Sequence, residues 1–229
     1  DPACLCDLDA VGATSDTLAR VHLSAPQGFR DPLAVAERRT MLQTAESAQP
    51  LREWTDALVA SRLPSDPTTL VPYFDPAEAG TGARVLVVME APGPMTNSGN
   101  RRPGSGFVSV DNDDQTAKNC WTLRDEVGLD ETRALHWNIV PWYLGPASTK
   151  PTARDLAEGA AALTSLMRIL CDLQVVMIAG RMAQRGWAKH VAPGLSPSDI
   201  VVIESWHPSP LCLNSRPERR EQLREDFAL

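Results

Sequence analysis

The sequence of 229 residues contains no hydrophobic run of about 18 residues, the length that a helix needs to cross a membrane. Its first ten residues have neither the basic start nor the apolar stretch of a signal peptide. These absences exclude an integral membrane protein and favour a cytoplasmic one with no membrane partner. With 43% hydrophobic residues, the chain can build one core of ordinary size.

The cysteines are few and irregularly placed. There are five, at Cys4, Cys6, Cys120, Cys171 and Cys212, and no two of them form a Cys-x-x-Cys pair. An odd number at irregular spacing favours reduced thiols over a disulfide framework. Cys4 and Cys6 alone do not make a metal site, so we predict no metal and no cofactor.

Basic residues are in short supply, and the net charge is −7. A polyanionic partner is bound mainly by Lys and Arg, so this balance argues at first sight against one. The charge is uneven, however. Residues 1–83 contain 12 acidic and 6 basic side chains, whereas residues 84–229 contain 17 and 16. The second part is nearly neutral and leaves room for a local basic face.

The pattern of apolar residues changes near residue 84. Residues 1–83 show helical spacing followed by a turn-rich stretch, and we interpret them as a helical extension packed on the rest of the chain. Residues 84–229 alternate short Val- and Ile-rich runs with longer helical segments, namely RVLVVME, ALHWNIVPW, QVVMIAG and DIVVIES with helices between them. Such runs are typical of a parallel sheet covered by helices on both faces. We expect one compact α/β unit.

Unusual residues follow the end of each predicted strand. The four segments are EAPGP, NIVPWY, GRMAQRG and HPSPL. Ligands of parallel α/β sheets bind beyond the carboxyl ends of the strands, so these segments are expected to meet at one edge. That edge is the candidate site.

Four side chains in or near these segments suggest a chemistry. Glu90 follows a strand and precedes a Pro-Gly turn, and Asn138 offers a donor and an acceptor side by side, which complements an imide edge such as that of uracil. Phe107 follows a glycine-rich approach and could lie over a planar ligand. His207 sits in a loop stiffened by two prolines and could donate to a developing anion. Each also has an ordinary structural interpretation, as a turn residue, a satisfied amide, a core aromatic or a capping histidine.

Taken together, these segments resemble the motifs of the uracil-DNA glycosylase superfamily. That family has a G-x-x-P-G motif after its first strand, then a G-x-x-F segment, an Asn in an N-V-V-like strand and a second motif H-P-S-P-L. The chain matches them in order with MEAPG, GSGFV, NIVPW and HPSPL. The resemblance implies a three-layer α/β/α fold with a central four-stranded parallel sheet, and hydrolysis of the N-glycosidic bond of a deaminated base in DNA.

The resemblance also implies roles for the matched residues. Phe107 would stack on a flipped base, Asn138 would read its edge, and His207 would hydrogen-bond the uracil O2 as negative charge moves onto the base. The turn of Ala91, Pro92 and Gly93 would line the pocket. In the most active family members an Asp occupies the position of Ala91, so Glu90 becomes the candidate for orienting the water.

Two features of some relatives are missing. The members with a G-E-A-P-G motif hold an iron–sulfur cluster through four cysteines, and one of these cysteines corresponds to Trp142. We therefore expect no cluster. Other relatives trap the product covalently through a His in the loop after the first motif. This loop has Asn100, Arg101, Arg102 and Pro103 and no His, so trapping is not expected.

The loops around the strand ends would contact DNA. The serine and amides of HPSPL would bind phosphate, basic side chains would add charge, and a leucine would fill the gap that a flipped base leaves. The residues concerned are Ser209, Pro210, Leu211, Leu213, Arg101, Arg102, Lys150 and Arg181.

The sequence thus predicts a monomeric, metal-free glycosylase that removes uracil or a related deaminated base from DNA in base excision repair, nucleoid-associated if the source is bacterial. Two alternatives stay open. One is a binding protein of the same fold with weak or no catalysis, which Ala91 and the acidic balance favour. The other is a glycosylase for another lesion, such as hypoxanthine or xanthine.

Overall fold

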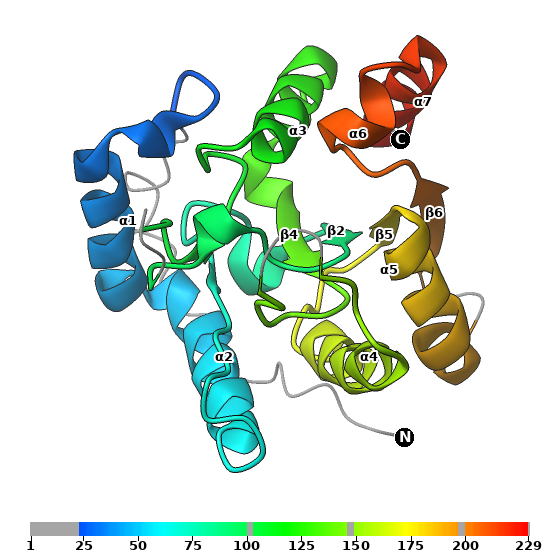
Figure 1. Cartoon of the computed structure of the whole chain (residues 1–229). Helices are drawn as coiled ribbons and strands as arrows, with labels where there is room; N and C mark the ends of the chain where they lie inside the picture. Colours follow the sequence, from blue (N-terminus) through cyan, green and yellow to red (C-terminus); the bar gives the residue numbers. More distant parts are fainter. Residues whose placement is uncertain (1–22, 100–102, 146–148, 197–199, 229) are drawn as a thin grey trace.

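The computed structural model describes residues 23–99, 103–145, 149–196 and 200–228. Its centre is a parallel sheet of four strands in the order β4-β2-β5-β6 (Figure 1). The predicted α/β class and the parallel four-stranded sheet are therefore confirmed. The strands are β2 (Val85–Met89), β4 (Ala134–Asn138), β5 (Val175–Ala179) and β6 (Val201–Ser205).

Helices cover both faces of this sheet because successive residues of each strand point to opposite sides. Leu86 and Val88 of β2 belong to a large buried cluster with residues of α4 and α5, whereas Val87 joins a second cluster with residues of α3 and α7. The helices of these two layers are α3 (Gln115–Val127), α4 (Ala153–Met167), α5 (Arg181–Gly186), α6 (Pro210–Leu213) and α7 (Pro217–Ala228). Within the described residues, no helix is long and apolar enough to span a bilayer.

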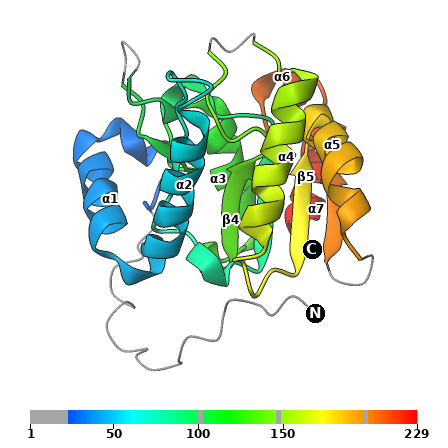
Figure 2. The ribbon, with the colours of Figure 1, turned by 90° about the horizontal axis from the view of Figure 1, so that it is seen from below.

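The N-terminal helices α1 (Pro32–Thr44) and α2 (Gln49–Arg62) lie together at one flank (Figures 1 and 2). The Trp54 ring of α2 lies 5.7 Å from that of Trp137 in β4, and Phe74 stacks on Trp137 at 3.8 Å between ring centroids. The helical extension therefore packs on the α/β core, while its boundary at residue 83 stays a prediction.

A buried arginine adds a polar link between the same two parts. Arg38 of α1 contacts Asp75 at 3.0 Å and Asp111 at 3.2 Å, and all three side chains are at most 5% exposed. Burial raises the pKa of Asp75, and the guanidinium opposes that effect. Removing Arg38 would leave two carboxylates buried without it, so the N-terminal layer and the segment around Asp111 depend on each other.

Short elements complete the chain, including a small parallel pair of β1 (Tyr73–Phe74) and β3 (Phe107–Val108). The prediction of reduced cysteines is wrong at one position, because Cys171 is disulfide-bonded, whereas Cys120 and Cys212 are free thiols. The remaining short elements are η2 (Gly28–Arg30), η3 (Glu46–Ala48), η4 (Gly80–Gly82), η5 (Pro94–Thr96), η6 (Glu131–Arg133), η7 (Trp187–Val191) and η8 (Ala192–Gly194).

Candidate active site

The carboxyl ends of the strands bring the predicted segments to one edge of the sheet. Met89 is in register with Asn138, so Glu90 follows β2 beside the end of β4. On the other side, Ala179 is in register with Ser205, and the amide of Gly180 donates to the Ser205 carbonyl at 2.9 Å. The segment that begins at Trp206 therefore leaves the sheet beside Gly180. The predicted convergence of strand ends is confirmed.

Contacts from the backbone, from Gly180 and from one side chain of α3 hold His207 and its loop. Its Nδ1 accepts a hydrogen bond from the Ser209 amide at 3.1 Å. Asn119 of α3 donates to the Pro208 carbonyl at 2.6 Å, which fixes the loop from the helix side. Gly180, at φ 95°, approaches so closely that a Cβ there would lie 2.9 Å from the His207 Cβ. The loop is therefore rigid for reasons beyond its prolines.

These contacts determine the protonation of the imidazole. Because Nδ1 accepts a hydrogen bond, the proton of the neutral ring is on Nε2. Burial lowers the pKa of His207 below its usual 6.5, while Glu90 acts to raise it and Lys150 to lower it. At neutral pH His207 is therefore an uncharged side chain whose Nε2–H is available as a donor.

Glu90 has a fixed main chain and a more exposed carboxylate. Its carbonyl accepts a hydrogen bond from the Val140 amide at 3.1 Å, which extends the pairing of β2 with β4 by one residue. Its side chain is 23% exposed, and Lys150 Nζ lies 3.0 Å from Oε1 and 3.3 Å from Oε2. Among the residues that the structure describes, the carboxylate is thus contacted by one side chain, that of the exposed Lys150.

The turn after Glu90 leaves open space beside it. Pro92 is buried and Ala91 is partly buried against the main core cluster. Gly93 is exposed, and a Cβ built on it would meet no heavy atom within 4 Å. This arrangement leaves room next to the strand end for a ligand that approaches the backbone.

Asn138, the last residue of β4, is 3% exposed. Its side chain makes no hydrogen bond to any other residue that the structure describes. Neither polar atom of this amide is among the fully buried ones that lack a partner, so the amide remains reachable by water or by a ligand that could satisfy it. The observation is consistent with a side chain that reads a polar edge.

Phe107 does not present the open face that we expected. It is 1% exposed, and its ring lies 6.2 Å from that of Phe29 in a cluster with α1. Its backbone is fixed on both sides, because its amide donates to Ser105 Oγ at 3.0 Å and Asn112 Nδ2 donates to its carbonyl at 2.9 Å. The residue is firmly placed, and its role as a stacking surface stays a prediction.

The two leucines after HPSP differ sharply in exposure. Leu211, in the first turn of α6, is 94% exposed, whereas Leu213 is 7% exposed and packs with Leu223 and Phe227 in the second core cluster. Leu213 is thus a core side chain with little surface to offer a ligand, and its role as a DNA contact stays a prediction. Leu211 keeps that prediction.

The remaining predicted DNA contacts fall into two groups. Ser209 is the N-cap residue of α6, its hydroxyl makes no capping bond, and Pro210 occupies the first turn. Arg181 begins α5 and is exposed. These three residues lie at the carboxyl edge of the sheet. Arg101 and Arg102 lie outside the described residues.

Trp142 occupies the place of the expected iron–sulfur cysteine. It is 3% exposed, the Arg62 guanidinium lies 3.3 Å from its ring centroid, and its Nε1 donates to Asp155 at 3.2 Å. Across the described ranges, no group of three His, Cys, Asp or Glu side chains could hold a metal. The prediction that the chain holds no cluster is left as a prediction.

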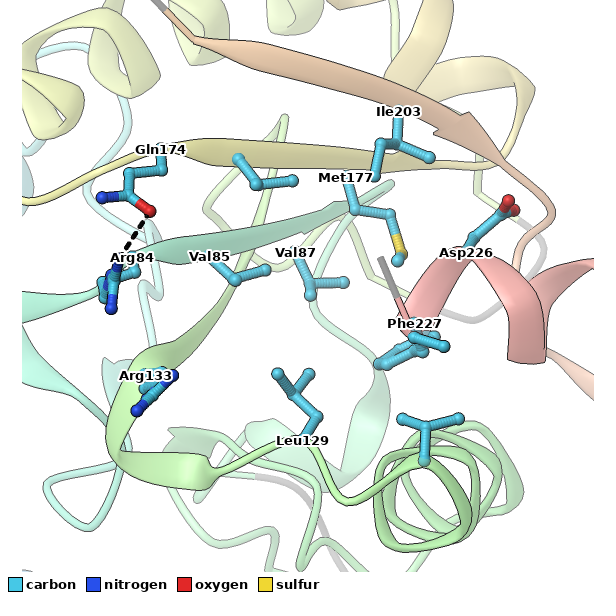
Figure 3. A pocket seen from close by; sticks show the side chains of 13 residues that line it. Arg84, Val85, Val87, Leu129, Arg133, Gln174, Met177, Ile203, Asp226 and Phe227 are labelled. Carbon is cyan, nitrogen blue, oxygen red and sulfur yellow. Dashed lines mark hydrogen bonds between the residues drawn. The ribbon is translucent and has the colours of Figure 1, made fainter.

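A cavity of about 250 Å³ lies elsewhere (Figure 3). Its lining includes Arg84, Val85, Arg133 and Gln174, which lie at the amino ends of the strands, opposite to the carboxyl ends where Glu90 and His207 lie. It is therefore separate from the candidate site.

Sequence reasoning missed two contacts that shape the site. Asn119 and Pro208 are 89 residues apart, and Lys150 and Glu90 are 60 apart, so neither pair leaves a local pattern. The only available signal was position, since Lys150 follows the segment after β4 and was expected at the same edge.

Comparison with known proteins agrees with this geometry. The search of curated proteins found no significant match. The model of the Uracil DNA glycosylase superfamily matches residues 76–228, which include the whole sheet and all the motif segments. The chain therefore belongs to the uracil-DNA glycosylase superfamily, whose members are DNA glycosylases.

Proposed function

We propose that this protein is a DNA glycosylase that hydrolyses the N-glycosidic bond of uracil or a related deaminated base. The observation that carries the proposal is the state of His207, a neutral imidazole with Nδ1 satisfied by the Ser209 amide and Nε2–H free to donate. Such a donor stabilises negative charge on a leaving base through its N–H dipole and keeps its proton.

The reaction follows from the chemistry of the bond. The bond between the base nitrogen and C1′ breaks, the electron pair stays on the base, and positive charge develops on the sugar. Water then adds to C1′ and releases a proton, which neutralises the base anion, leaving an abasic sugar and the free base. His207 would stabilise the base anion, and Glu90 would orient the water and stabilise the sugar cation.

The base must leave the stack to reach a buried side chain such as Asn138. Its amide would donate to one exocyclic oxygen and accept from the ring N–H, as an imide edge requires. The turn of Ala91, Pro92 and Gly93 would line the pocket, and Phe107 would support the ring. Ser209, Pro210, Leu211 and Arg181 would contact the DNA around it.

Cleavage of oligonucleotides tests the proposal. Single- and double-stranded substrates with uracil, hypoxanthine, xanthine or 5-substituted uracil at one position are incubated with the protein, and abasic sites are detected by strand breakage in alkali. Abasic product from the uracil substrate is expected. Binding without product would favour the alternative that Ala91 suggests, a base-binding protein without turnover. Product only from another lesion would identify a different specificity.

Asn138→Asp tests the reading of the base. A carboxyl group can accept from the amino group of cytosine, so we expect uracil cleavage to fall and cytosine cleavage to rise, with a change in preference of roughly 10- to 100-fold or more. The measurement is the ratio of single-turnover rates on matched uracil and cytosine substrates. An unchanged ratio would remove Asn138 from base recognition.

A further inference from the structure

Lys150 is the nearest charged neighbour that the structure gives to the Glu90 carboxylate. It precedes α4 by three residues, and its Nζ contacts both oxygens of Glu90, at 3.0 and 3.3 Å. The ammonium group is thereby placed across both oxygens. This contact with both carboxylate oxygens orients the Glu90 side chain.

The base of the Lys150 segment is firmly anchored. Pro151 is buried, and Thr152 caps α4 through a capping box: the Asp155 amide donates to the Thr152 hydroxyl at 3.1 Å, and the Thr152 amide donates to Asp155 Oδ2 at 2.8 Å. Asp155 also accepts a hydrogen bond from buried Trp142. Lys150 is thus two residues away from a fixed helix start, although its own side chain is 67% exposed.

Glu90 and Lys150 also both affect the pKa of His207. Both influence the charge state of His207, with opposite signs, and they are the charged side chains that do so among the described residues. The three residues come from three elements, namely the turn after β2, the loop before α4 and the loop after β6. An unpaired Glu90 would place its full negative charge near His207 and near the base that is to leave as an anion.

We propose that Lys150 is a positioning residue for the proposed glycosylase reaction. It holds the Glu90 carboxylate at the water side of the site and offsets its charge, so that His207 remains a neutral donor. This inference rests on the proposed function. It differs from the simpler expectation that Lys150 is one more DNA phosphate contact, because its partner in this structure is a carboxylate inside the site.

The test compares Lys150→Gln, Lys150→Arg, Glu90→Gln and the double variant Lys150→Gln/Glu90→Gln. Lys189→Gln, an exposed lysine in η7, is the matched control for loss of one charge. Single-turnover cleavage is measured at saturating protein across pH, so that DNA affinity does not enter the rate. Thermal unfolding of each variant checks the fold.

We expect Lys150→Gln to slow the single-turnover step about two- to fivefold, the scale of one partly exposed ion pair. Lys150→Arg should retain most of the rate, and Lys189→Gln should not change it. In the Glu90→Gln background, Lys150→Gln should have no further effect, because its partner is gone. An equal loss in both backgrounds would overturn the proposal. So would a loss of DNA affinity with an unchanged single-turnover rate, which is the signature of a phosphate contact.

A second measurement does not depend on activity. The imidazole of His207 is titrated by NMR in the free protein and in the same variants. Lys150→Gln removes a positive charge and should raise the pKa of His207. Glu90→Gln removes a negative charge and should lower it. Equal values in all variants would overturn the proposal. If these shifts occur in a protein that cleaves none of the bases, the proposed function fails while the coupling of the three residues stands.

Discussion

His207 and Glu90 lie at the ends of different strands and are held in different ways. The His207 loop is fixed by main-chain contacts from Ser209 and Gly180 and by the Asn119 side chain, and His207 itself is partly buried. The Glu90 carboxylate is 23% exposed and its partner Lys150 is 67% exposed. One side of the site is therefore fixed by the fold, whereas the other depends on an ion pair in contact with solvent.

This difference matches what each step of the proposed reaction demands. Stabilising a base anion requires a donor that is already in place and dry, because a dipole that must reorganise loses much of its effect. Orienting a water that attacks a sugar cation requires less, since the cation is strongly electrophilic. The two sides should therefore respond unequally to substitution.

The largest effect is expected from His207→Ala. Loss of one donor to a developing anion typically costs on the order of 100-fold or more in turnover. Glu90→Gln should cost less, and the ratio of the two losses measures the asymmetry. Single-turnover rates on one uracil substrate provide it. His190→Ala, in η7, is the control for removing an imidazole.

The pH profile of the unchanged protein belongs to the same test. Burial lowers the pKa of His207 below 6.5, so the imidazole stays neutral to a lower pH than a free histidine would. Activity should therefore fall only when the pH drops below the lowered pKa of His207. Its contribution to stability has the same sign, because the unfolded chain binds the proton first and stability is lost as pH falls below 6.5. If His207→Ala and Glu90→Gln lower the single-turnover rate by similar factors, the two sides of the site do not differ in the way proposed.

The next effect is expected from Gly180→Ala, which acts on His207 without touching substrate chemistry. At φ 95° an alanine is strained, and its Cβ would lie 2.9 Å from the His207 Cβ. We expect the free energy of unfolding to fall by about 1–3 kcal/mol and turnover to fall on the order of tenfold, because the imidazole is displaced.

Gly194→Ala is the matched control, since nothing lies within 4 Å of its Cβ position and its φ is not in the left-handed region. Denaturant unfolding and single-turnover rates are the measurements. If Gly180→Ala keeps the parental rate, the rigidity of the His207 loop is not needed for turnover.

Sequence patterns predicted the sheet and the edge at which the site lies, because uninterrupted Val and Ile runs report burial on both faces and parallel strands must end together. They did not predict Phe29 against Phe107 or Arg38 between Asp75 and Asp111, since these contacts join segments more than 30 residues apart. Local patterning carries no information about such pairs.

Leu211 and Leu213 show the same limit at the scale of one turn. Both are leucines two residues apart in a stretch with no clear period, and only the docking of α6 on α7 decides that one is core and the other solvent-exposed. Cys171 is a further case, because the cysteine count alone argued against any disulfide.

The smallest effect on the chemistry is expected from Leu211→Ala, which removes the most exposed side chain of the rigid His207 loop. A side chain that fills the gap left by a flipped base recovers part of the unstacking cost. Cleavage of duplex DNA should therefore fall on the order of fivefold, whereas cleavage of single strands should hardly change. The free energy of unfolding should stay within about 0.5 kcal/mol of the parental value.

Leu213→Ala, in the same short helix, should behave in the opposite way. It opens a cavity in the core and should lower the free energy of unfolding by about 2–5 kcal/mol, with an equal effect on both kinds of substrate where the protein is folded. Together the two variants distinguish the effect of an exposed side chain on DNA cleavage from the effect of a core side chain on stability. Equal losses on duplex and single strands for Leu211→Ala would mean that the rigid side of the site contacts the base alone and leaves the DNA stack to other loops.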